Sequence, residues 1–149
     1  MSDASASRRS SLPRTIGRVV LGLFLLLAGI GHLTFGREAF TAQVPDWLPL
    51  PDDLVVVGSG VVELALGASL IALPRHRVVV GWIVAAFFVA IFPGNISQYV
   101  NRVDAFGLTS DLARGVRLIL QPLLVLWALW STGAWRDRGT LLSAIGRRR

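Results

Sequence analysis

The sequence predicts an all-α membrane protein built as a bundle of four transmembrane helices. The 149 residues are 53% hydrophobic and only 16% charged, and their mean hydropathy of +0.60 exceeds what soluble domains of this size tolerate. Four long runs lie between charged residues, at Arg18–Arg37, Asp53–Arg75, Arg77–Arg102 and Arg117–Arg136. Three of the runs contain no charge, and the second contains a single glutamate. Each run offers the roughly 20 residues that a helix needs to cross a hydrocarbon core of about 30 Å. Alternating segments of about ten residues, typical of a transmembrane barrel, do not occur in the sequence.

The expected helices follow from these runs. We predict four of them, at 16–35, 54–73, 78–99 and 115–134. Together with their connections they make one membrane domain over residues 15–135. Residues 1–14 are small, polar and rich in arginine, so we expect a disordered cytoplasmic tail there. Residues 136–149 are predicted to form a basic cytoplasmic tail.

The connections differ in length and composition. Between the first two helices, Pro45, Pro49 and Pro51 preclude a regular helix, although one short helix over 37–43 is expected. This Pro-rich segment is predicted to form an outer loop that lies against the bilayer. The turn at 74–77 is short, so the second and third helices should be antiparallel neighbours.

The arginines predict the orientation. All 15 cationic residues are arginine, and most of them flank one side of the bundle: Arg8, Arg9, Arg14, Arg18, Arg75, Arg77, Arg136, Arg138, Arg147, Arg148 and Arg149. The other side holds fewer, namely Arg37, Arg102, Arg114 and Arg117. Because positive flanks stay in the cytoplasm, both termini are predicted to be cytoplasmic. The expected location is the plasma membrane, which in a bacterium is the inner membrane.

Charge and cysteine content exclude several function classes. The net charge of +6 is explained by topology and by attraction to anionic lipid, so no nucleic-acid partner is expected. The chain has no cysteine. This excludes a disulfide framework, thiolate metal sites, iron–sulfur clusters and a dithiol redox relay.

One carboxyl group lies at the centre of a predicted span. Glu63 shares a helix face with Ser59, Gly60 and Gly67. Small residues let a neighbouring helix approach closely, so Glu63 should point into the bundle. A charge facing lipid at this depth would cost about 2.5–3.5 kcal/mol on insertion scales.

Polar residues of the other three predicted helices lie near the same end. With a rise of about 1.5 Å per residue, Glu63 lies roughly 13 Å below the outer edge. The others lie roughly 3 to 9 Å below it: Gln121, His32, Asn95 and Arg117. They predict one polar pocket that opens toward the outer face, with Glu63 as its floor. Ser59 and Tyr99, each one turn from a pocket residue, complete the expected ligand-binding set.

Simpler roles compete with a functional site. Glu63 could be a buried structural residue hydrogen-bonded to a neighbouring helix, and His32 a satisfied interhelical donor. Arg117 could be an interfacial anchor that reaches lipid phosphate. Asn95 and Gln98 could merely cap the frayed outer end of their helix.

Five motifs in order resemble the DoxX family of small four-helix membrane proteins. They are G-x-x-H (Gly29, His32), P-x-W-L-P (Pro45, Trp47, Leu48, Pro49), S-G-x-x-E (Ser59, Gly60, Glu63), F-P-x-N (Phe92, Pro93, Asn95) and R-x-x-x-Q-P (Arg117, Gln121, Pro122). The resemblance covers about residues 16–135. It implies a four-helix membrane fold and links to quinone-dependent sulfur oxidation, terminal oxidases and complexes against oxidative stress.

Three functions are open at this point. In a quinone-linked redox accessory subunit, Glu63 and His32 would exchange protons with a quinone, and the pocket would bind it through Ser59, Asn95, Tyr99, Arg117 and Gln121. Such an oxidoreductase subunit would need a redox or membrane protein partner as electron donor. The only other histidine, His76, lies in the opposite turn, so no haem with paired histidines is expected, and no metal site. The alternatives are a non-catalytic assembly or interaction protein and a small transporter or proton-conducting protein.

Overall fold

The computed structural model describes residues 10–105, 107 and 109–139, which form helices and connections without any strand. The helices are α1 (Leu12–Leu33), α2 (Arg37–Thr41), α3 (Asp52–Ala72), the 3₁₀ turn η1 (Pro74–His76), α4 (Arg77–Val100) and α5 (Asp111–Thr132). The predicted all-α class and the short helix in the first connection are confirmed. The disorder expected over residues 1–14 is wrong at residues 12–14, which form the first turn of α1 because a proline is tolerated there. Residues 1–9, and most of the basic tail predicted over 136–149, lie outside the described residues.

Four helices of the described chain, α1, α3, α4 and α5, are long and apolar enough to cross a membrane. The protein is therefore a multi-pass membrane protein whose apolar helix faces contact lipid. α1 and α5 begin four residues before their predicted starts, at Leu12 and Asp111. Arg18 was expected at the flank of the first helix, but it lies two turns inside α1 and is buried.

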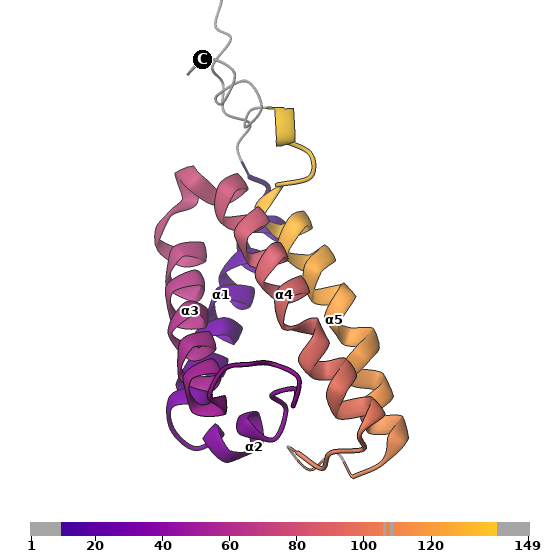
Figure 1. The fold of residues 1–149 in the computed structure, drawn as a ribbon. Helices are drawn as coiled ribbons and strands as arrows, with labels where there is room; N and C mark the ends of the chain where they lie inside the picture. The colour runs from indigo at the N-terminus through magenta and orange to yellow at the C-terminus, as the bar shows by residue number, and fades with distance from the viewer. Residues whose placement is uncertain (1–9, 106, 108, 140–149) are drawn as a thin grey trace, which may run out of the picture.

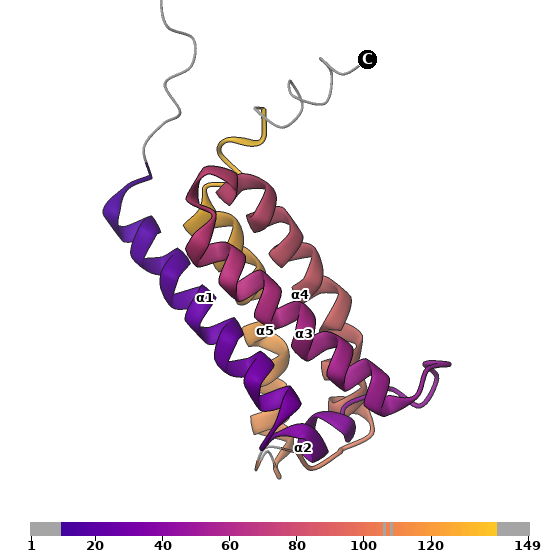
Figure 2. The ribbon, with the colours of Figure 1, turned by 90° about the vertical axis from the view of Figure 1, so that its left-hand side faces the viewer.

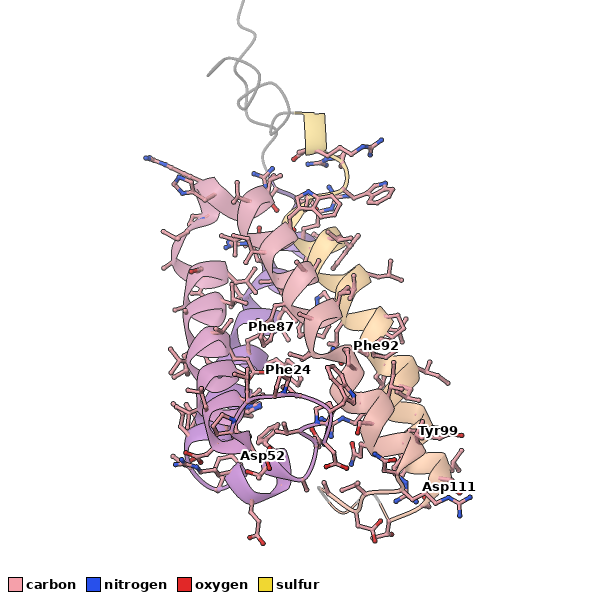
Figure 3. The ribbon with its side chains drawn as sticks, in the orientation of Figure 1. Phe24, Asp52, Phe87, Phe92, Tyr99 and Asp111 are labelled. Atoms are coloured by element: carbon pink, nitrogen blue, oxygen red, sulfur yellow. The ribbon has the colours of Figure 1, made fainter. Side chains whose placement is uncertain are left out.

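The long helices are arranged as two pairs. α1 packs mainly on α3, and α4 packs mainly on α5 (Figure 1). We call the end that carries α2 and the starts of α3 and α5 the pocket end; Asp52 and Asp111 mark it in Figure 3. The opposite end, called the terminal end, carries the start of α1, the turn η1 and the end of α5 (Figure 2).

The pairing differs from the expectation drawn from the short turn. The turn at η1 does bring α3 and α4 together as antiparallel neighbours, but they contact each other only lightly. Small residues decide the main contacts instead. A Cβ atom added at Gly67 would lie 2.7 Å from the carbonyl oxygen of Gly22, and one added at Gly29 would lie 2.8 Å from that of Gly60. α1 and α3 therefore approach so closely that glycine is required at their crossing.

A second close approach joins α4 to α5. A Cβ atom at Gly81 would lie 2.7 Å from that of Thr132, whose side chain is fully buried. Around this contact, an apolar core fills the terminal half of the bundle with residues from all four long helices, among them Leu21, Leu70, Val84 and Ala128. The terminal half is therefore closed.

Polar contacts tie the two ends. At the terminal end, Arg18 donates a hydrogen bond to the carbonyl oxygen of Leu70, and Arg77 pairs with Asp137 at 2.9 Å. At the pocket end, Arg114 bridges Asp104, at 2.7 Å, and Asp111, at 2.8 Å. Arg114 thus fixes the connection between α4 and α5 to the start of α5.

Candidate functional site

A cavity of about 620 Å³ lies between the two helix pairs at the pocket end. All four long helices line it, and so does the segment that leads from α2 to α3. Six of the seven predicted site residues are among its lining residues: His32, Ser59, Glu63, Asn95, Arg117 and Gln121. The prediction that polar side chains from four helices gather in one pocket is confirmed.

The carboxyl and the imidazole meet inside this cavity. Glu63 is only 4% exposed and His32 only 8%. Nδ1 of His32 lies 2.9 Å from Oε2 of Glu63 and 3.0 Å from the carbonyl oxygen of Ala28, one turn earlier on α1. Because a carbonyl oxygen can only accept, Nδ1 carries a proton, and in the neutral form of the ring the lone pair lies on Nε2.

That single Nδ1 proton cannot satisfy both oxygens well. The contact with Ala28 has the geometry of a hydrogen bond, whereas the contact with Glu63 has only the distance of an ion pair. Among the described residues, Oε2 of Glu63 therefore has no hydrogen-bond partner, although it is buried. A buried oxygen in this state costs about 1–3 kcal/mol, so it favours any ligand that supplies a donor.

Local packing fixes both groups. The His32 ring stacks on Phe40 of α2, with 3.3 Å between ring centroids and 18° between ring planes. Gly60 lets α1 approach, since a Cβ atom there would lie 2.7 Å from that of His32. Ser59, one turn from Glu63, donates to the carbonyl oxygen of Val56 at 2.9 Å, which leaves its oxygen free to accept.

The opposite wall is a chain of amides ending at a guanidinium. Gln121 donates to the carbonyl oxygen of Phe88 at 2.7 Å and accepts from Asn95 at 3.0 Å. Asn95 in turn accepts from Nε of Arg117 at 3.1 Å. Asn95 therefore links α4 to α5 inside the pocket, and does not cap the end of its helix. Arg117 lines the cavity, so in this structure it is not simply an anchor at the membrane interface.

Gln43 completes this wall, and the sequence did not reveal it. It accepts from Nη2 of Arg117 at 2.9 Å and donates to Oε1 of Gln98 at 3.0 Å. Both glutamines are buried. Gln43 is the last residue of the short helix expected over 37–43, and in the structure it follows the end of α2 at Thr41. Because that helix is separate from the spanning helices, no spacing rule relates Gln43 to the polar residues of those helices. The only hint in the sequence was that Gln43 is a polar residue between the interfacial apolar residues of that segment.

Tyr99 is the exception among the predicted site residues. It does not line the cavity, its residue is 41% exposed, and Figure 3 shows it on the side of α4 away from α1 and α3. Its ring packs near Gly115 of α5. Residues 98 and 99 follow Asn95 by about one helical turn but point in different directions around α4. Gln98 points toward Gln43 of the pocket wall, and Tyr99 points toward α5. The prediction that Tyr99 lines the pocket is therefore wrong.

The remaining lining is largely apolar and aromatic, with Phe24, Trp47, Phe88, Leu120 and Leu124 among the contributors. The described residues contain no group of three His, Asp or Glu side chains that could hold a metal ion. The pocket thus combines apolar walls with one carboxyl, one imidazole and one guanidinium. This composition suits an organic ligand with an apolar body and a few polar atoms.

A comparison with protein families places the whole pocket inside one family domain. The family model described as "Domain of unknown function (DUF8561)" matches residues 21–132, a range that contains every residue lining the cavity. No curated protein and no solved structure matches the chain. The chain therefore belongs to the family described as a domain of unknown function, DUF8561.

Proposed function

We propose that this protein is a membrane-embedded subunit that binds a quinone or quinol for a redox partner. The proposal includes a distant relationship to the DoxX family, suggested by the five motifs of the sequence. The observation that carries it is the buried Oε2 of Glu63, which lacks a hydrogen-bond partner among the described residues and faces a largely apolar cavity. A ligand hydroxyl would supply the missing donor.

The residues present fit such a ligand. A quinol hydroxyl can donate to Glu63, while a quinone carbonyl can accept from the guanidinium of Arg117, which belongs to the opposite wall. Aromatic and aliphatic side chains, Phe88 and Trp47 among them, would cover the ring.

The chemistry of the couple sets what the chain must provide. Reduction of a quinone to a quinol takes up two electrons and two protons. Glu63 and His32 are able to release and accept protons at Oε2 and Nε2. The electrons must come from the redox cofactor of a partner protein or from a soluble donor, so the activity belongs to a complex.

The two other candidate functions have less support. A transporter or proton conductor needs a path through the bundle, but the apolar core that includes Leu21, Leu70 and Val84 fills the terminal half. An assembly protein would use its small-residue faces to bind partners. In α1 and α3 those faces are already occupied within the chain, where Gly22 meets Gly67 and Gly29 meets Gly60.

We further propose that the pocket end faces outward and that both termini are cytoplasmic. Among the described residues, six arginines lie toward the terminal end, against four toward the pocket end. The six are Arg14, Arg18, Arg75, Arg77, Arg136 and Arg138. The plasma membrane is the matching location, and the pocket would then lie in its outer leaflet.

Replacement of Glu63 by Gln tests the proposed function. Wild-type protein, Glu63→Gln and the control Glu38→Gln, which alters the exposed glutamate of α2, are purified in mild detergent. Small molecules extracted from each are identified by mass spectrometry. We expect a quinone in the wild type and the control, and at least tenfold less in Glu63→Gln, because an amide oxygen accepts a weaker hydrogen bond than a carboxylate oxygen and cannot take up a proton.

A second measurement guards against a variant that does not fold. Added quinone should raise the unfolding temperature of the wild type and the control, since a ligand that binds only the folded state stabilises it. The proposed function would be refuted if all three proteins are equally stable, contain no quinone and show no change in unfolding temperature when quinone is added.

A further inference from the structure

The seam between α1 and α5 is closed at the terminal end. Trp127 donates a hydrogen bond to the carbonyl oxygen of Gly17 at 3.1 Å. A Cβ atom at Gly17 would lie only 2.8 Å from the ring of Trp130. The two helices are thus in tight contact where α1 begins and α5 ends.

The same helix faces separate toward the pocket end. Phe24 lies two turns after Gly17 on α1, and Leu120 lies two turns before Trp127 on α5, each on the face that makes the closed contact. Val116 continues the face of α5 by one more turn. Figure 1 shows α1 and α5 diverging in this direction, and Figure 3 shows Phe24 between the two helix pairs.

The three apolar residues at the separated part line the cavity and remain exposed. The exposed fraction is 46% for Phe24, 46% for Val116 and 50% for Leu120, and all three belong to the cavity wall. A side chain that lines a cavity while half of its surface is open marks a mouth. We call this mouth, defined by Phe24, Val116 and Leu120, the α1–α5 portal.

The other gap between the helix pairs, which lies between α3 and α4, is partly covered. The segment from α2 to α3 crosses in front of the gap between α3 and α4 (Figure 1), and a Cβ atom at Gly94 of α4 would lie 3.2 Å from the carbonyl oxygen of Gln43. The hydrogen bond between Gln43 and Gln98 holds this segment in place. Trp47, Ala90 and Pro93 also line the cavity on this side and are exposed, so the pocket has a second opening beside the segment. The α1–α5 portal is the opening lined by residues of spanning helices alone, and it faces the lipid that surrounds these membrane helices.

We infer that the ligand reaches the pocket sideways from the bilayer through the α1–α5 portal and carries a hydrocarbon tail that stays in it. This inference rests on the proposed function and narrows the ligand to a lipid-soluble, tailed compound. The polar head lies against Glu63 and Arg117, and the tail lies between Phe24, Val116 and Leu120. Such a ligand never has to leave the apolar phase, so its tail does not have to cross water to reach the pocket. The tail adds affinity through close van der Waals packing against the portal side chains.

The test compares two quinones with the same head group. One carries a ten-carbon chain, and the other, 2,3-dimethoxy-5-methyl-1,4-benzoquinone, carries none. Binding of each is measured by titration to purified wild type, Leu120→Trp and Ile119→Trp. Ile119 is the matched control, because it precedes Leu120 on α5, is 67% exposed and does not line the cavity.

We expect Leu120→Trp, which fills the portal, to weaken binding of the tailed quinone at least tenfold. Binding of the tailless quinone should change less than twofold, and Ile119→Trp should match the wild type for both. The wild type could bind both quinones tightly while Leu120→Trp loses neither, or loses both equally. That result would refute entry through the portal but leave the proposed quinone site intact. Failure of the wild type to bind either quinone would refute the proposed function, and the portal with it.

Discussion

Gln43 shows how one residue outside the helices can hold a site together. Its amide joins Arg117 of α5 to Gln98 of α4, and through them the connection from α2 to α3 is tied to the pocket wall. Gln98 continues the link to the carbonyl oxygen of Val103 at 3.3 Å. Buried amides of this kind cost free energy when a partner is lost, because no water replaces it.

Replacement of Gln43 by Met removes both hydrogen bonds while keeping the shape of the side chain. We expect the free energy of unfolding to fall by about 1–3 kcal/mol, because Oε1 of Gln98 loses its donor in a buried position. Reversible unfolding in mixed micelles of mild detergent and dodecyl sulfate measures this change. Ala42→Met, at the exposed neighbouring position, should leave stability unchanged; equal stability of both variants would show that the Gln43 bonds contribute nothing.

At the scale of the helix, the charged residues that delimit an apolar run do not mark the ends of the helix. The charged residues that delimit the apolar runs mark where the chain can meet lipid, but a helix can continue past them. α1 therefore includes Arg14 and Arg18 and starts with Pro13 in its first turn, where the missing N–H is harmless. α5 starts at Asp111, capped by Ser110, whose side chain accepts from the amide of Ala113.

The α1–α3 contact makes a prediction for helix packing. Gly67→Ala should lower the free energy of unfolding by about 1–3 kcal/mol, because the new methyl group would press on the backbone of α1 at Gly22 and Leu26. Gly58→Ala on the same helix is the control, since a Cβ atom there has nothing within 4 Å. The control should be neutral or up to about 1 kcal/mol more stable, as alanine favours helix. The micelle unfolding assay separates the two, and similar values for both would contradict the close crossing.

At the scale of the molecule, four antiparallel helices bring the start of α1 and the end of α5 to one end and the pocket to the other. The apolar core closes the terminal half, so the pocket is a blind recess with its mouth at the side. A recess of this shape suits binding from the membrane better than passage through it.

The orientation can be measured directly because the chain has no cysteine. Single cysteines replace Asp46, in the exposed segment after α2, and Arg138, exposed after α5. We expect a membrane-impermeant maleimide to label Asp46→Cys in intact cells and to label Arg138→Cys only after permeabilisation. The reverse pattern would invert the proposed orientation, and labelling of both in intact cells would contradict an odd number of crossings between them.

The sequence by itself determined the number of membrane helices, their approximate limits and the gathering of polar residues at one end. Hydropathy and helical period are local properties, and bilayer thickness fixes the length of a span, so local patterns alone could place Glu63, His32, Asn95 and Gln121 toward the same end of the bundle. Only the tertiary structure decided which helices pair, which side of α4 Tyr99 takes, and that Gln43 completes the wall. These depend on close approach between distant segments, which no local pattern encodes.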